Sequence, residues 1–413
     1  MVMEKKHITY WNLIKKPLAH GAIYVSGTAI SGIVSLITFP ILARLVSVSG
    51  MGEYDFFLFL LMIAVPFTTI GIEYGFGAFA HELSLSETNS LLKKIIPFSV
   101  TSAMLLSSLI FTLKIINIFQ TFSYKLILLW AFSLIAISFC TILKSLMIWR
   151  QHPIKAAIII NGEWILASIL GIFLVLFLGH KIDNYLIGLS IAFAVSSFMS
   201  FKLWPKSTAH TDSHIHLKQI LEISWPYGIT NMLFLISLGI EKAIILKALG
   251  PYALGIYAMA NKVGTIPQLI GLNFIMGWIP EIIKSPDSKK IYKTLWLIMF
   301  IYGVCAIMIS FLFRTPIIGF FGGEKYSESV NLLPIATIAS VIGLIPWTIN
   351  AILLKRKQTL PILYYSIISS LITIALSPVL ISKYEIMGAI YAVITGRVIG
   401  SIGFIYKIKK HRK

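Results

Sequence analysis

Charged residues are scarce in this sequence of 413 residues. Asp, Glu, Lys and Arg make up 12% of it, whereas soluble globular proteins are about 25% charged. Hydrophobic residues make up 57%, and the longest polar stretch is only about fifteen residues, near 205–216. This composition excludes an ordinary water-soluble protein and predicts a chain embedded in a membrane.

Cysteines and metal-ligand patterns are also almost absent. The two cysteines, Cys140 and Cys305, lie inside apolar runs without a CxxC partner, so we interpret both as buried free thiols. His210, His214 and His216 lie in the polar stretch without Cys, Asp or Glu at a defined spacing. A solvated linker is the simpler interpretation of that stretch. We predict no metal and no cofactor.

Catalytic motifs are missing too. The sequence contains no G-x-S-x-G, no H-E-x-x-H, no GxxxxGK[ST] and no Asp-rich metal motif. A membrane-embedded sugar polymerase or ligase would need a polar loop to align donor and acceptor, and the sequence has none of sufficient length. We therefore predict that the protein is not an enzyme. An ion gradient, the substrate gradient or a separate subunit would have to drive any transport.

Acidic residues are few, with 16 Asp and Glu against 35 Lys and Arg, and the formal net charge is +19. The basic residues are scattered at the ends of apolar runs rather than gathered on a polar domain, so we do not expect nucleic-acid binding. With a cytoplasmic N-terminus, 24 of the 35 lie on the cytoplasmic side and eight on the other. This bias predicts that both termini are cytoplasmic.

Long apolar runs are abundant, and each crossing of a bilayer core needs about 20 such residues. Because lipid cannot satisfy open backbone groups, every crossing should be an α-helix. We predict twelve transmembrane helices, near residues 19–44, 53–79, 92–113, 124–146, 154–179, 184–204, 219–248, 253–280, 291–313, 328–353, 361–381 and 386–406.

The chain also contains an internal repeat, which is a common way of building transporters. The shared pattern is a basic residue, a glycine eight positions on and a tyrosine two positions further, at the same place relative to the apolar runs. The two occurrences are 203 positions apart, namely Arg44, Gly52 and Tyr54, then Lys247, Gly255 and Tyr257.

The repeat and the even number of crossings predict the domain organisation. We expect a six-helix lobe over 1–204, a cytoplasmic linker over 205–218 and a second six-helix lobe with a basic tail over 219–413. Since six crossings separate the halves, both lobes have the same orientation, related by a pseudo-two-fold axis along the membrane normal.

Ionisable residues inside the predicted spans are the candidate functional residues. A charge at membrane depth costs at least ~2.5 kcal/mol on lenient scales, so such a side chain usually faces a partner or a watery cavity. Interhelical pairing that only holds the bundle together is the alternative. Arg44 and Lys247 lie at the outer ends of spans, where snorkelling is the alternative to binding. The candidates within the spans are Glu73, Glu163, Glu241, Lys242, Lys262 and Arg397.

Three segments resemble the bacterial O-antigen and polysaccharide flippases of the multidrug, oligosaccharidyl-lipid and polysaccharide exporter superfamily. They are LITFPILARLVSVSGMGEYDFF, GIEKAIILKALGPYALGIYAMANKV and FFGGEKYSESVNLLPIATIAS, and the resemblance covers essentially the whole chain. Family members commonly carry Asp-Arg in span seven. Here Glu241-Lys242 keeps the charges but replaces the forked guanidinium with a single ammonium group.

The resemblance implies two six-helix lobes around a cationic cavity, and alternating access that moves an undecaprenyl-diphosphate-linked oligosaccharide to the outer leaflet. It implies a multi-pass protein of the bacterial inner membrane, with a polymerase and glycosyltransferases of the same pathway as expected partners. We expect a monomer, because one chain is enough to supply both lobes. Substrate-binding residues would be Lys262, Lys242, Arg397, Arg44 and Lys247, while Glu73, Glu163 and Glu241 would couple an ion or form structural ion pairs. The alternative is a drug or cation antiporter of the same fold, in which these glutamates bind cations or protons.

Overall fold

The computed structural model describes residues 32, 34–79, 83–115, 123–150, 152–205, 215–237, 239–272, 274–275, 288–355 and 360–410. Within these ranges every regular element is a helix, and none is a strand. Nine of the helices in these ranges are long and apolar enough to cross a membrane. The predicted all-α polytopic fold is confirmed.

Several described helices follow the predicted spans closely. Tyr124–Trp149, for example, corresponds to the span predicted over 124–146, and Ser288–Leu312 to that over 291–313. Two predicted spans, however, are each divided between two helices. The span predicted over 219–248 is divided between Leu217–Ser237 and the first part of Ile240–Gly264, and the span predicted over 328–353 between Leu332–Ile342 and Leu344–Lys355. The first, seventh and eighth predicted spans and the predicted linker lie partly outside the described residues. After the helix Val34–Leu45, the elements are α2 Val48–Thr69, α3 Ile72–Phe79, α4 Leu85–Ile115, α5 Tyr124–Trp149, α6 Pro153–Leu178, α7 Ile182–Leu203, α8 Leu217–Ser237, α9 Ile240–Gly264, α11 Ser288–Leu312, α12 Arg314–Gly322, the 3₁₀ helix η1 Glu324–Val330, α13 Leu332–Ile342, α14 Leu344–Lys355 and α15 Leu360–Lys410.

Backbone breaks interrupt several spans. Ile70 and Gly71 both have positive φ, and they separate α2 from α3 inside the second predicted span. Gly250, with φ of 85°, joins two helical arms within α9, because glycine adopts this conformation without a Cβ clash. Glu385, with φ of 52°, similarly divides α15 at the boundary between the last two predicted spans.

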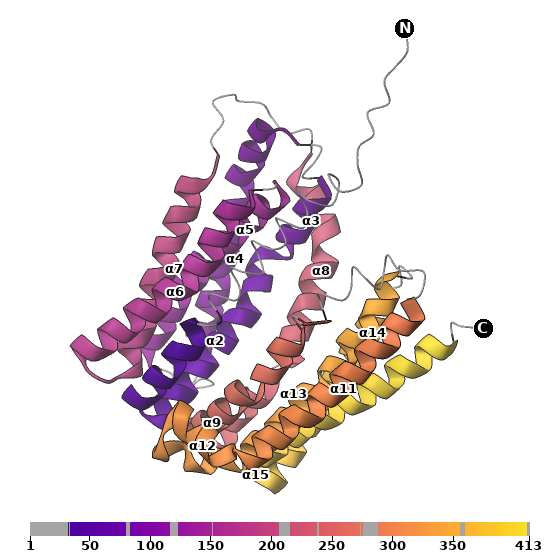
Figure 1. The fold of residues 1–413 in the computed structure, drawn as a ribbon. Helices are drawn as coiled ribbons and strands as arrows, with labels where there is room; N and C mark the ends of the chain where they lie inside the picture. The colour runs from indigo at the N-terminus through magenta and orange to yellow at the C-terminus, as the bar shows by residue number, and fades with distance from the viewer. Residues whose placement is uncertain are drawn as a thin grey trace. The chain divides into compact units, whose positions relative to one another are not determined.

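Packing divides the described chain into two compact units. The first unit takes the described residues up to Phe39 together with 64–179 and 183–229, and the second takes 40–63, 180–182 and 230–410. The helices of each unit are labelled in Figure 1. The lobes 1–204 and 219–413, which we inferred from the repeat, are a division of the sequence and stay a prediction.

In the first unit, α5 packs against α3, α4 and α6. Buried apolar side chains such as Phe76, Leu91 and Leu146 form its core. Hydroxyl pairs add interhelical hydrogen bonds, with Ser133 Oγ 2.7 Å from Ser190 Oγ. Such bonds hold membrane helices together where burial of apolar surface gains little. Cys140 is buried as predicted, but Cys305 of α11 in the second unit is exposed, because its helix presents it on the outer face.

In the second unit, α9 packs against α13 and α15. The first part of α2 crosses α9 at two glycines: a Cβ on Gly52 would overlap the carbonyl oxygen of Pro251, and a Cβ on Gly255 would overlap that of Val48. Small residues allow this close backbone approach. Gly52 and Gly255 occupy equivalent positions of the repeat, so the crossing joins its two copies.

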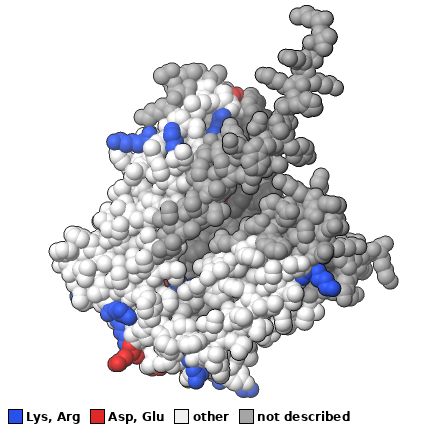
Figure 2. All heavy atoms as spheres, in the orientation of Figure 1, with Lys and Arg blue, Asp and Glu red and all other residues white. Residues whose placement is uncertain are grey.

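Large apolar side chains cover the outer surfaces of the helices. Leu105 is 68% exposed, Phe177 71% and Phe300 68%. On the face shown in Figure 2, charged side chains are few among the described residues and leave broad uncharged surfaces between them. Contiguous apolar surface of this extent is typical of contact with lipid.

Candidate functional site

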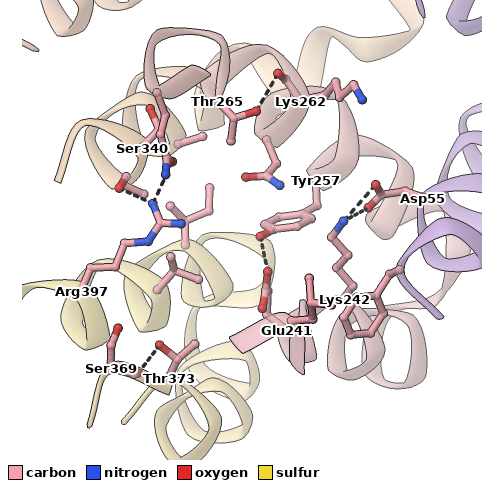
Figure 3. A pocket seen from close by; sticks show the side chains of 18 of the residues that line it. Asp55, Glu241, Lys242, Tyr257, Lys262, Thr265, Ser340, Ser369, Thr373 and Arg397 are labelled. Carbon is pink, nitrogen blue, oxygen red and sulfur yellow. Dashed lines mark hydrogen bonds and ion pairs between the residues drawn. The ribbon is translucent and has the colours of Figure 1, made fainter. Parts of the chain in front are cut away.

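A cavity of about 380 Å³ lies within the second unit. It is bounded by α2, the end of α8, α9 with its helical continuation to Leu272, α13 and both arms of α15. Small-molecule sites commonly fall in this range of volume. Glu241, Lys242, Lys262 and Arg397, four of the predicted site residues, line this one cavity (Figure 3).

Lys242 forms an ion pair across the cavity wall. Its Nζ lies 2.8 Å from Oδ2 and 3.0 Å from Oδ1 of Asp55 on α2. The ammonium also lies 5.9 Å from the centre of the Phe59 ring, within the range of a cation–π contact. The two side chains are 13% and 23% exposed, so the pair is only partly screened by water.

Glu241, the residue before Lys242, points in a different direction. The hydroxyl of Tyr257 donates a hydrogen bond of 2.9 Å to Oε1 of Glu241, which is 2% exposed. Both residues belong to α9, on either side of the Gly250 kink. The kink allows the Tyr257 hydroxyl on the second arm of the helix to donate its hydrogen bond to the Glu241 carboxylate on the first arm.

Arg397 and Lys262 supply the other positive charges. Nη1 of Arg397 donates to the carbonyl oxygen of Ala339 at 2.6 Å and lies 3.5 Å from Oε1 of Gln268. These contacts fix the guanidinium at the wall between α13 and α15. Lys262, on the second arm of α9, interacts electrostatically with Asp55 and Lys242 in the same cavity.

The cavity combines these charges with neutral hydrogen-bonding groups. Three lysine or arginine side chains and two carboxylates give a formal balance of +1 in the fully ionised state. Around them lie hydroxyl and amide groups suited to the hydroxyls of a sugar: Asn261, Thr265, Gln268, Ser340, Ser366, Ser369 and Thr373. The site can therefore hold an anionic, polyhydroxylated group inside an apolar protein.

Four other predicted site residues do not line this cavity. Nη2 of Arg44 donates to the carbonyl oxygen of Phe320, 2.8 Å away at the end of α12, and Lys247 is exposed. Glu73 and Glu163 belong to the first unit. Binding of substrate by Arg44 or Lys247 stays a prediction.

Asp55 and Tyr257 were not among the predicted site residues. Asp55 lies near the start of a predicted span, where a carboxylate is usually explained by solvent at the membrane surface. Tyr257 belongs to the repeated motif, which we interpreted as a sign of internal duplication. The spacing of Tyr257, Asn261 and Thr265, four residues apart along one helix, with Lys262 three residues before Thr265, was the available signal, since residues three and four apart share a face.

A family model described as "Polysaccharide biosynthesis protein" matches residues 18–285. This match covers more than half of the chain. The chain belongs to this family. A second model, MatE, matches residues 285–379.

Similar proteins agree with this assignment. The chain is 21% identical, over 274 residues covering 63% of it and 69% of the relative, to the "Capsular polysaccharide biosynthesis protein CapF" of Staphylococcus aureus. Its structure is similar to the lipid II flippase MurJ in an inward closed conformation, with a TM-score of 0.69, 19% identity and coverage of 94% and 87%.

It is also similar to an inward-facing multidrug resistance transporter of the MATE family in the MOP superfamily. The TM-score is 0.68, with 12% identity and coverage of 92% of this chain and 94% of that one. At these identities the structural likeness shows the fold, which is that of the two-lobe transporters of this superfamily. Together with the apolar helices, this fold identifies a multi-pass membrane protein, so the prediction at that level is confirmed.

Proposed function

We propose that the protein moves an undecaprenyl-diphosphate-linked oligosaccharide, a repeat unit of O-antigen or another surface polysaccharide, from the cytoplasmic to the outer leaflet of the bacterial inner membrane. It does so as a monomer by alternating access, with both termini in the cytoplasm. Its partners are the polymerase and glycosyltransferases of the same pathway. The single observation that carries this proposal is the convergence of Lys242, Lys262 and Arg397 on one hydroxyl-lined cavity.

The chemistry of the substrate explains why such a cavity is needed. A diphosphate and sugar headgroup cannot enter hydrocarbon without losing its hydration, whereas the prenyl chain is already soluble there. Cations in a partly dehydrated cavity attract the diphosphate more strongly than they would in water. Hydroxyl and amide side chains replace water around the sugar.

The test uses a strain that lacks the gene. Loss of surface polysaccharide, with complete lipid-linked units accumulating on the cytoplasmic side, is expected, and the wild-type gene should restore the polymer. Lys262→Met should restore about tenfold less, because a hydrogen bond to a charged group contributes ~1.5–3 kcal/mol. Lys293→Met is the control: it removes an exposed lysine of α11 that does not line the cavity, and it should restore fully.

Immunoblots of membrane fractions would verify that both variants reach wild-type abundance. Normal polysaccharide in the deletion strain, with no second flippase present, would overturn the proposed function. Full restoration by Lys262→Met would instead remove Lys262 from the substrate site.

A drug or cation antiporter is the second candidate, because the same cavity contains the carboxylates of Asp55 and Glu241. Both already have partners, Lys242 and Tyr257, and this favours the flippase. Survival of the deletion strain on cationic drugs separates the two functions. Increased drug sensitivity with unchanged surface polysaccharide would establish the antiporter.

A further inference from the structure

One cation of the cavity is held by the backbone of a neighbouring helix. Arg397 belongs to the second arm of α15 and lines the cavity (Figure 3). Its Nη1 donates to the carbonyl oxygen of Ala339 on α13 at 2.6 Å. Oε1 of Gln268 lies 3.5 Å from the same Nη1. One end of the guanidinium is therefore fixed at the wall of the cavity.

The position of Ala339 near the end of α13 explains why its carbonyl suits a cation. α13 ends at Ile342, and Gly343 is its C-terminal cap before α14 begins at Leu344. The N–H of Gly343 donates to the Ala339 carbonyl at 3.2 Å, and the second lone pair of this oxygen accepts from Arg397. The dipole of α13 also makes its last turn negative, which favours a positive charge there. The break between α13 and α14 thus provides the anchor for the guanidinium.

Gly343 lacks a side chain at the place where the guanidinium needs space. A Cβ at this position would lie 2.9 Å from Nη1 of Arg397 and 3.0 Å from Nε2 of Gln268, closer than the roughly 3.5 Å at which nonbonded atoms pack. Both atoms are the ends of flexible side chains, and the next nearest atom is the carbonyl oxygen of Ser340 at 3.1 Å. A methyl group at position 343 would therefore move the guanidinium rather than the helices.

The other end of the guanidinium is available to a ligand. A guanidinium carries five N–H donors in a planar fork, and the two on Nη1 are directed to Ala339 and Gln268. Within the described part of the chain, Nε and Nη2 of Arg397 donate to no residue, and Arg397 forms no ion pair. Arg397 is only half-buried, so three N–H donors remain for a molecule inside the cavity.

The Nε–Nη2 edge has the shape that binds a phosphate group through two parallel hydrogen bonds. The other cations of the cavity, Lys242 and Lys262, carry ammonium groups, which bind anions as point charges. Lys242 is also 2.8 Å from Oδ2 of Asp55. Of the described residues that line the cavity, Arg397 is the one with a forked cation. It therefore supplies the directional contact that a lysine at position 242 cannot make.

We propose that the Nε–Nη2 edge of Arg397 binds the diphosphate of the substrate through two hydrogen bonds, and that Gly343 is the residue that positions this edge. Gly343 contacts no substrate and acts through Arg397. It leaves the space in which Nη1 stays bound to Ala339 while the opposite edge is presented to the ligand. This inference rests on the proposed function, because that function supplies the diphosphate.

Lipid binding by the purified protein tests the role of the fork. The probe is undecaprenyl diphosphate, titrated into the protein in nanodiscs of phosphatidylcholine, whose headgroup has no net charge. Arg397→Met should weaken binding by about tenfold or more, the factor expected for hydrogen bonds to charged groups. Arg397→Lys keeps the charge but loses the fork, so it should weaken binding almost as much. Wild-type affinity in Arg397→Lys would overturn the two-bond contact.

Gly343→Ala tests the positioning role. It should weaken binding several-fold and leave the midpoint of thermal unfolding close to that of wild type, because only side-chain ends have to move. In the Arg397→Met background the same change should have no further effect, and a double-mutant cycle of affinities measures this coupling.

Gly403→Ala is the matched control for Gly343→Ala. It adds a methyl group to α15 outside the cavity, where the nearest side-chain atom is 3.8 Å away, and it should bind like wild type. Wild-type affinity in Gly343→Ala, or an equal loss with and without Arg397, would overturn the positioning role. A large fall in its unfolding midpoint would overturn it as well, since the methyl group would then have moved the helices.

Two further probes separate this inference from the proposed function. Undecaprenol lacks the diphosphate and should bind wild type much more weakly. If wild type binds both lipids equally, the cavity does not recognise a diphosphate, and the proposed function fails together with the inference. If wild type prefers the diphosphate and the Arg397 and Gly343 variants do so equally well, the inference fails and the flippase stands. Inorganic pyrophosphate should compete only weakly, and competition at equal concentration would overturn the assignment to a lipid headgroup.

Discussion

The two copies of the internal repeat meet in the second unit, and they share their packing but not their chemistry. Gly52 of one copy approaches the carbonyl of Pro251, and Gly255 of the other approaches the carbonyl of Val48. Gly52 and Gly255 are equivalent positions of the repeat, 203 residues apart, and so are Val48 and Pro251. The two contacts are therefore equivalent. A contact in which residue i meets j and j meets i is the signature of two-fold symmetry.

The charged residues break this symmetry. Lys262 of the second copy corresponds to Phe59 of the first, and Asp55 of the first corresponds to Ala258 of the second. Phe59 places its ring near Lys242, while Lys262 lines the cavity. The comparison teaches that backbone packing is held in common, whereas the cavity charges are specific to one copy.

The largest expected effect comes from the shared glycines. Gly255→Ala places a methyl group against the carbonyl oxygen of Val48, so the two helices must separate. We expect the free energy of unfolding to fall by about 3 kcal/mol, the upper end of the cost of overpacking. The midpoint of thermal unfolding in detergent should fall accordingly. If the two copies are equivalent in packing, Gly52→Ala should lose a similar amount.

Gly319→Ala on α12 is the control, because nothing lies within 4 Å of a Cβ at that position. It should be neutral or slightly stabilising, since alanine favours a helix by up to ~1 kcal/mol over glycine. Equal midpoints for Gly255→Ala and Gly319→Ala would show that the crossing is not tightly packed.

An intermediate effect is expected where the copies differ in charge. Asp55→Asn removes the partner of Lys242, and we expect the free energy of unfolding to fall by about 2 kcal/mol. This is less than the 3–5 kcal/mol for a fully buried pair, because both side chains are partly exposed. The double variant Asp55→Asn with Lys242→Met should recover most of that loss. A double-mutant cycle of unfolding midpoints measures the coupling, and additive losses would argue against a stabilising pair.

The smallest effect should come from a single hydroxyl. Tyr257→Phe leaves Oε1 of the buried Glu241 without its donor, and we expect a loss of about 1–2 kcal/mol. Tyr252→Phe removes a hydroxyl that binds Glu328 at an exposed site, where the same change should matter little. Thermal unfolding of the two variants, compared side by side, checks this order. A larger loss for Tyr252→Phe would contradict it.

The fold could be predicted from the sequence because lipid imposes one strong rule. A run of about 20 apolar residues must become a helix, so the predicted spans 124–146 and 291–313 coincide with α5 and α11. The position of a charged residue within a span also indicates how costly its charge is in the membrane. On this basis we predicted Lys242, Lys262 and Arg397 as site residues. The cavity unites them with Glu241.

Partners across helices could not be predicted in the same way. The sequence specifies how deep a residue lies, but not which face of a neighbouring helix it meets. Lys144 lies near the end of a predicted span, and we counted it among the basic residues on the cytoplasmic side. The structure instead pairs it with Glu163 of α6. Asp55 was overlooked for the same reason, although it holds Lys242 from another helix.

The reciprocal glycine crossing has an evolutionary consequence. It has the form of a homodimer interface enclosed in one chain, in which a single ancestral surface had to fit itself. Once duplicated, Gly52 and Gly255 were each confined by the other copy's backbone, while positions such as Phe59 and Lys262 were free to diverge. Mutations should therefore accumulate unevenly along the repeat. Both glycines of the crossing should be conserved together, whereas residues that line the cavity should change in one copy independently of the other.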